Sequence, residues 1–239
     1  MHPEYRNRGN YGDRIIPAQA LQRIPDPPYG DTYPIKLPDG DWAELPMLAL
    51  PPDFDTAIAY LCLTENSFAL EDRLSSAVAD LVRPLDAGIV VGMPTLGMAL
   101  ATSVAKKLGH ERYVPLSYSR KFWFEDDLSV AVNSITTPIQ PKTVFIDPKL
   151  LERLDGQRVL LVEDVISTGG TVAAELALMK KVGAEVVGVA TAIKETRVWS
   201  ENLARIDPLY PALVRAPIRC PLFRKMDGGW VPDWSTLPE

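Results

Sequence analysis

Short apolar runs alternate with longer amphipathic segments through the middle of the chain. Apolar residues fill 87–92 and 159–162, the latter within a strand predicted over 158–162, and each run is followed by a polar or glycine-containing turn and a segment with helical periodicity. A further β-branched run covers 185–193. Repeated strand and helix patterns of this length predict an α/β fold with a mainly parallel, twisted sheet flanked by helices. Ligands bind at the carboxyl ends of the strands in such sheets.

The flanking segments have a different pattern. Residues 1–32 show no periodicity, and residues 33–50 predict a β-hairpin around an Asp-Gly turn. Residues 55–63 and 69–81 have helical spacing of apolar positions. We therefore divide the chain into three parts. These are an arm and hairpin (1–50) that forms a small hood or a dimer contact, a core (51–204), and a tail (205–239) that is a candidate part of the hood.

Composition and charge argue against several classes of function. The chain has 239 residues and a net charge of -6, which argues against a nucleic-acid surface because phosphate contacts need clustered Lys and Arg. Its two cysteines, Cys62 and Cys220, lie far apart without partners at metal-ligand spacing. No apolar run approaches the roughly 20 residues of a membrane span. We expect a cytoplasmic protein with small-molecule substrates and no nucleic-acid or membrane partner.

The clearest chemical signal lies in residues 159–171, where two acids follow a buried strand and a small-residue loop opens a helix. Glu163 and Asp164 can accept hydrogen bonds from sugar hydroxyls and oppose positive charge at a reacting carbon. The loop amides at the helix start can surround a phosphate. The candidate phosphate-binding residues are Val165, Ile166, Ser167, Thr168, Gly169, Gly170 and Thr171. The alternative is that the acids cap the helix and the loop is only a tight connection.

Residues 159–171 consist of four apolar residues, two acids, two apolar residues and a Ser/Thr/Gly loop. This order resembles the binding motif for 5-phosphoribosyl 1-pyrophosphate (PRPP) in type I phosphoribosyltransferases. The resemblance is to the purine-salvage branch, which includes the xanthine and adenine enzymes. It implies transfer of ribose 5-phosphate from PRPP to a purine base with release of pyrophosphate, and a homodimer. Glu163 and Asp164 would be catalytic. Mg²⁺ would be held by PRPP and water, with Asp164 nearby and no direct protein ligand.

Residues 92–97 lie where this family has its pyrophosphate loop, so the resemblance assigns pyrophosphate binding to Thr95, Leu96 and Gly97. The family often has Arg where Leu96 stands, and a basic group is therefore expected from elsewhere. A simple strand-to-helix turn is the alternative. A Walker loop is excluded, because Met98 occupies the position of its lysine.

Arg120 and Lys121 resemble the basic pair that opens the mobile catalytic loop of the family, with residues 134–137 as the strand that returns from it. They would reach pyrophosphate while the aromatic residues 122–124 exclude water. The alternative is a solvated pair beside a packed aromatic cluster.

The family resemblance assigns base recognition to Lys194 and Asn66, and Val165 would form an apolar wall against the base. An ammonium and an amide together would suit a 6-oxopurine. A lysine at a strand end is, however, usually solvated, and an asparagine between helices is usually a cap.

Two other functions stay open. The chain could be a PRPP-binding regulator without catalysis, although residues 1–50 lack the helical pattern of a DNA-binding domain. It could also transfer the phosphoribosyl group to a pyrimidine or to a specialised acceptor.

Overall fold

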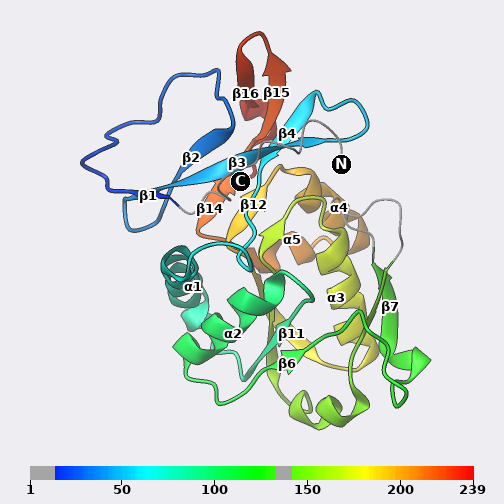
Figure 1. Ribbon diagram of the computed structural model, residues 1–239. Coiled ribbons are helices and arrows are strands. Elements are labelled where there is room, and N and C mark those ends of the chain that lie inside the picture. Colours follow the sequence, from blue (N-terminus) through cyan, green and yellow to red (C-terminus); the bar gives the residue numbers. More distant parts are fainter. Residues whose placement is uncertain (1–13, 133–141) are drawn as a thin grey trace.

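The computed structural model describes residues 14–132 and 142–239. Figure 1 shows a larger lower unit of sheet and helices beneath an upper unit of strands. The central sheet is parallel, and among the described residues its order is β13-β11-β9-β5-β6. The strands are β13 (Val214–Arg215), β11 (Glu185–Ala190), β9 (Arg158–Val162), β5 (Ile89–Gly92) and β6 (Val114–Pro115). The predicted parallel α/β core is therefore confirmed.

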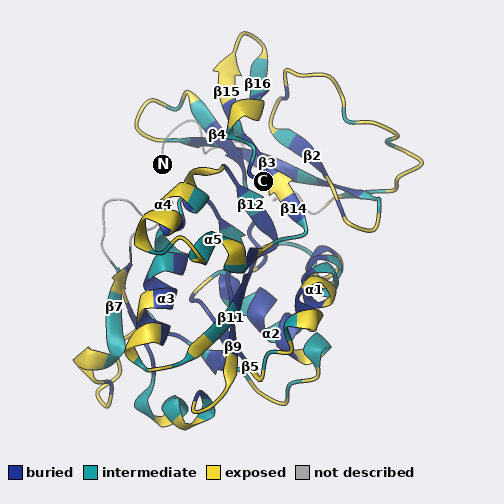
Figure 2. Cartoon of the chain, turned by 180° about the vertical axis from the view of Figure 1, so that it is seen from behind, coloured by how far each residue is buried: buried dark blue, intermediate teal, exposed yellow. Residues whose placement is uncertain are grey.

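Helices cover both faces of this sheet. One face carries α1 (Phe68–Val82) and α2 (Gly97–Leu108), and the other carries α3 (Gly170–Lys181), α4 (Val198–Ile206) and α5 (Tyr210–Leu213). Successive strand residues point to opposite faces. Leu160 accordingly packs into the cluster with α1 and α2, and Leu161 into the cluster with α3 and α4. The central strands are dark blue in Figure 2, because both faces are covered.

A smaller parallel sheet continues beyond the carboxyl ends of the main strands. Its strands are β10 (Val165–Ile166), β12 (Ile193–Glu195) and β14 (Ile218–Cys220). The backbone at Glu163 and Asp164 joins the two sheets, since the Glu163 amide donates to the Ala190 carbonyl (3.0 Å) and the Ala192 amide donates to the Asp164 carbonyl (2.8 Å). The acid pair is thus fixed between them.

The upper unit, which we call the hood, is built from both ends of the described chain. It contains β1 (Ile15–Ile16), β2 (Thr32–Lys36), β3 (Trp42–Leu50), β4 (Thr56–Ala59), β15 (Leu222–Met226) and β16 (Gly229–Asp233). The predicted hairpin is β2 with β3, and β15 of the tail pairs with β4. Phe223 is fully buried there, with its ring 4.7 Å from that of Tyr33.

Two predictions of local structure are wrong. Residues 55–63 do not form a helix but contain β4, in which Ala57, Ile58 and Ala59 are all buried. A fully buried strand has no polar face, so its apolar residues also satisfy helical spacing. The run at residues 185–193 is not one strand but is divided between β11 and β12.

The remaining elements are a two-stranded antiparallel pair and several short turns. β7 (Ser129–Val132) pairs antiparallel with β8 (Lys142–Phe145). Short 3₁₀ turns lie at Arg83–Leu85, Asp126–Leu128, Pro148–Arg153 and Trp234–Thr236. Residues 134–137, expected as a returning strand, lie outside the described residues. No described helix is both long and apolar enough to cross a membrane.

Candidate active site

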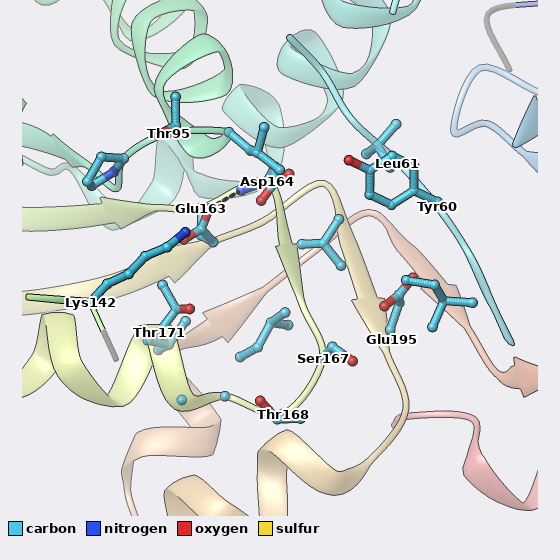
Figure 3. Close-up of a pocket in the computed structure, with 18 of the residues that line it drawn as sticks. Tyr60, Leu61, Thr95, Lys142, Glu163, Asp164, Ser167, Thr168, Thr171 and Glu195 are labelled. Atoms are coloured by element: carbon cyan, nitrogen blue, oxygen red, sulfur yellow. Dashed lines mark hydrogen bonds between the residues drawn. The ribbon is translucent and has the colours of Figure 1, made fainter. Parts of the chain in front are cut away.

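A cavity of about 350 Å³ lies between the carboxyl edge of the sheet and the hood. Figure 3 shows its floor, where the acid pair lies among side chains from several elements. From the core, it is lined by Pro94, Thr95, Leu96, Tyr118, Lys142, Glu163, Asp164, Val165, Ile166, Ser167, Thr168, Gly169, Gly170, Thr171, Val172 and Glu195. From β4 and the segment after it come Ile58, Tyr60 and Leu61.

The acid pair is buried at the floor of the cavity, and each residue is 6% exposed. The Asp164 amide donates to Glu163 Oε1 at 3.1 Å. Burial raises the pKa of Glu163 well above its usual range, and the neighbouring Asp164 charge raises it further. Burial also raises the pKa of Asp164. Both carboxyls would therefore gain from a nearby positive charge, such as a cation or an oxocarbenium-like carbon.

A third acid lies close to this pair. Glu175 of α3 is fully buried, and neither of its carboxylate oxygens has a hydrogen-bond partner in the part of the chain that the structure describes. Burial raises its pKa well above the usual range, and its charge contributes to the raised pKa of Glu163. The site thus concentrates acidic groups that need neutralisation.

The phosphate loop opens α3 as predicted, and all seven of its candidate residues line the cavity. Gly169 has a φ of 80°, and an added Cβ would lie 3.2 Å from Trp199 Cβ, so glycine is required. The Thr168 carbonyl accepts a hydrogen bond from Asn202 Nδ2 of α4 (2.9 Å). Ser167 Oγ is buried and has no hydrogen-bond partner among the described residues. The helix-start amides and this hydroxyl form a suitable phosphate cradle.

The predicted pyrophosphate loop reaches the opposite wall. Thr95 and Leu96 line the cavity, and Gly97 begins α2 beside the acid pair. A Cβ on Gly97 would lie 2.7 Å from Glu163 Oε1 and 3.0 Å from Glu163 Cα. The absent side chain lets the start of α2 approach the acids. The peptide bond between Pro94 and Thr95 is cis.

The structure does not bring the predicted basic pair to the cavity. Arg120 Nε donates to Asp126 Oδ1 at 3.0 Å, and Lys121 is exposed. Of the adjacent aromatic residues, Phe122 is 93% exposed and Phe124 is buried against Phe145. The role of this pair in pyrophosphate binding stays a prediction.

The assigned base-binding residues are also separated. Val165 lines the cavity, but Lys194 and Asn66 do not. Lys194 Nζ lies 5.1 Å from the centre of the Trp199 ring, and burial lowers the pKa of Lys194, as do Arg219 and Arg215. Asn66 precedes α1, and its buried side-chain amide has no hydrogen-bond partner within residues 14–132 and 142–239. The role of these two residues in base binding stays a prediction.

The sequence interpretation missed Glu195, the neighbour of Lys194 in β12. Side chains alternate along a strand, so when Lys194 points away from the cavity Glu195 points into it. Glu195 is 2% exposed, and burial, together with repulsion from Asp164, raises its pKa to about 8. Strand alternation was the signal that could have found it.

Tyr60 and Lys142 were missed as well. Tyr60 belongs to the segment mistaken for a helix, and burial raises the pKa of its hydroxyl. Lys142 lies far from the motifs in sequence, and its Nζ is 5.0 Å from the centre of the Tyr118 ring. The sequence carries no local signal for either.

Comparison with known proteins agrees with this geometry. The family model described as phosphoribosyl transferase domain matches residues 69–206, which include both loops and the acid pair. The chain belongs to this phosphoribosyl transferase family. The match spans α1 through α4 and leaves out the hood strands at both ends.

Among curated members of the family, adenine phosphoribosyltransferase of Frankia casuarinae is 35% identical over 133 residues, covering 56% of this chain and 65% of that protein. Adenine phosphoribosyltransferase of Thermotoga petrophila is 31% identical over 128 residues, covering 54% and 71%. The chain spans less than two thirds of the length of the Frankia casuarinae and Frankia alni relatives, at 65% and 57%.

Solved structures of the family share the fold. Adenine phosphoribosyltransferase from Thermoanaerobacter pseudethanolicus has a TM-score of 0.57 at 18% identity, covering 73% of this chain and 94% of that one. The Giardia lamblia enzyme complexed with 9-deazaadenine has a TM-score of 0.56 at 19% identity, covering 72% and 91%. At these identities the likeness shows the type I phosphoribosyltransferase fold alone.

Proposed function

We propose that this chain transfers ribose 5-phosphate from PRPP to a purine base, giving a nucleoside monophosphate and pyrophosphate. The observation that carries the proposal is the meeting of the acid pair and the whole phosphate loop in one cavity. A phosphate on the loop at residues 165–171 would place the attached ribose over Glu163 and Asp164. Family membership and the names of the curated relatives support the same chemistry, with adenine as the first base to test.

The reaction exchanges one bond at the anomeric carbon. The lone pair of a base nitrogen attacks this carbon while the bond to the pyrophosphate oxygen breaks, and the bonding electrons leave with pyrophosphate. The nitrogen proton passes to water, and the configuration at carbon inverts. Glu163 and Asp164 would oppose the positive charge that develops on the ribose.

Mg²⁺ fits the chemistry of this site. Carboxylate oxygens are the ligands that it prefers, and it commonly binds through one or two carboxylates, water and substrate phosphates. Neither acid forms an ion pair within the described residues. No group of three or more metal-ligating side chains is gathered in that part of the chain. We propose that PRPP and water hold the ion near Asp164, where it would neutralise the leaving pyrophosphate.

Two finer expectations remain, one from the family resemblance and one from the pattern of the sequence. The homodimer and the cytoplasmic location stay predictions.

The test is pyrophosphate release from PRPP and Mg²⁺ with adenine, guanine, hypoxanthine, xanthine, orotate or uracil added separately. We expect release with a purine and none without a base. Detection of the matching nucleoside monophosphate by chromatography identifies the acceptor. PRPP binding without release for any base would contradict catalysis and favour a regulator, and release with orotate or uracil alone would contradict the purine assignment.

A further inference from the structure

The cavity has an uneven distribution of charge. Its described lining includes the carboxyls of Glu163, Asp164 and Glu195 but a single cationic side chain, that of Lys142. PRPP would add a phosphate and a pyrophosphate to these acids. The loop at residues 92–97 supplies no cationic side chain, because its residues are Gly-Met-Pro-Thr-Leu-Gly. Lys142 is therefore the cationic side chain in the described lining that could offset this negative charge.

Lys142 is held at the cavity by its strand. It begins β8 and pairs with Val132 of β7. At the other end of β8, Phe145 exchanges two backbone hydrogen bonds with Ser117, at 2.8 and 2.9 Å. These contacts fix the strand beside the segment that carries Tyr118.

Tyr118 supports the lysine side chain. Lys142 Nζ lies 5.0 Å from the centre of the Tyr118 ring, and both residues line the cavity. This distance permits a cation–π interaction. Lys142 forms no ion pair within residues 14–132 and 142–239. Its ammonium is thus oriented without being neutralised.

The cavity has two ends, which Figure 3 shows on either side of the acid pair. Lys142 and Thr95 lie at one end, and Tyr60, Leu61 and Glu195 lie at the other. Inversion at the anomeric carbon requires the base and the leaving group on opposite sides of the ribose. The end with Tyr60, Leu61 and Glu195 has apolar and hydrogen-bonding surface for a base, which leaves the end with Lys142 for pyrophosphate.

We propose that Lys142 binds the pyrophosphate group of PRPP and supplies the cationic side chain that the loop at residues 92–97 lacks. The proposal rests on the proposed function. An ammonium near the leaving oxygens would strengthen PRPP binding and stabilise the charge that accumulates as the bond to carbon breaks. Lysine acts here as a point charge, so its position matters more than a fixed hydrogen-bond geometry.

The experiment compares ligands with and without pyrophosphate. Binding of PRPP, pyrophosphate and ribose 5-phosphate, each with Mg²⁺, is measured by calorimetry for the wild-type protein and for Lys142→Met and Lys142→Arg. We expect Lys142→Met to weaken PRPP and pyrophosphate binding by about tenfold to a hundredfold, as for loss of a charge-assisted hydrogen bond. Ribose 5-phosphate binding should stay within about twofold, and Lys142→Arg should recover most of the PRPP affinity.

Lys149→Met is the matched control. Lys149 Nζ lies 5.2 Å from the centre of the Trp123 ring, so it makes a similar cation–π contact, but it does not line the cavity. We expect unchanged binding of all three ligands. Thermal unfolding of each variant separates lost binding from lost folding.

The outcomes distinguish this proposal from the proposed function. Unchanged PRPP binding in Lys142→Met, with binding intact in the wild type, would overturn the role of Lys142 alone. Equal weakening of ribose 5-phosphate and PRPP would also overturn it, since the lysine would then act on the whole cavity. Failure of the wild-type protein to bind PRPP would overturn the proposed function and this proposal with it.

Discussion

The phosphate loop and the base end of the cavity are built in different ways. The loop and its acid pair come from one continuous stretch, residues 159–171, and the structure leaves that order intact. The base end combines Tyr60 and Leu61 from the edge of the hood with Glu195 from the small parallel sheet. A contiguous site is encoded locally, whereas a composite site depends on how distant segments pack.

The largest expected effect is a loss of folding stability when the core of the hood is disrupted. Phe223→Ala should lower the free energy of unfolding by about 3–5 kcal/mol, because it removes a fully buried aromatic ring packed against Tyr29 and Tyr33. Urea unfolding measures the change. Phe122→Ala, at a side chain that is 93% exposed, should change it by less than about 0.5 kcal/mol. A loss below about 1 kcal/mol for Phe223→Ala would mean that the hood contributes little to folding.

The next effect is on the acid pair. Asp164→Asn should lower kcat by about a hundredfold to a thousandfold, because it removes a charge that would stabilise the reacting ribose. Folding should be retained, since burial already disfavours the charged form. Pyrophosphate release and thermal unfolding are measured together. Asp155→Asn, at an exposed acid that does not line the cavity, is the control, and wild-type turnover in Asp164→Asn would refute the ribose assignment.

The stability of the protein should depend on pH through Glu195, which lies at the base end of the cavity. The pKa of Glu195 rises from its ordinary value to about 8 on folding, so between about pH 5 and 8 the unfolded state binds fewer protons and stability falls as pH rises. Glu195→Gln should flatten this fall, by at most about 4 kcal/mol at pH 8. Chemical unfolding from pH 5 to 9 measures both slopes. Glu152→Gln, at an exposed site, should leave the profile unchanged, and equal slopes for wild type and Glu195→Gln would contradict the assignment.

The smallest expected effect separates a helix cap from a base contact. Ser67 Oγ accepts a hydrogen bond from the Leu70 amide at 3.3 Å and caps α1. Ser67→Ala should lower the free energy of unfolding by about 1 kcal/mol without changing the KM for the base. Ser76→Ala on the same helix should be nearly neutral. A raised KM in Ser67→Ala would indicate that residues 66–67, just before α1, contact the base.

The fold was largely predictable because its strongest signals are local. β9 has the predicted bounds, and α3 follows the small-residue loop as predicted. Glu195 was missed as a cavity residue because of side-chain direction, since a shift of one residue changes the face of the strand. Ile58 was hidden by the fully buried pattern of β4, which periodicity does not separate from a helix. Lys142 reaches the cavity only through the β7 and β8 pairing, which has no sequence signature.

The pairing of β4 with β15 also has a consequence for biosynthesis. Residues 56–59 leave the ribosome early, but their hydrogen-bond partners at residues 223–224 follow only after the whole core has been translated. Domains fold in the order in which they emerge, and unpaired strand edges promote aggregation. A nascent chain would therefore complete its phosphate cradle while β4 still has an open edge, and this is the interval in which a chaperone would be most useful to the protein.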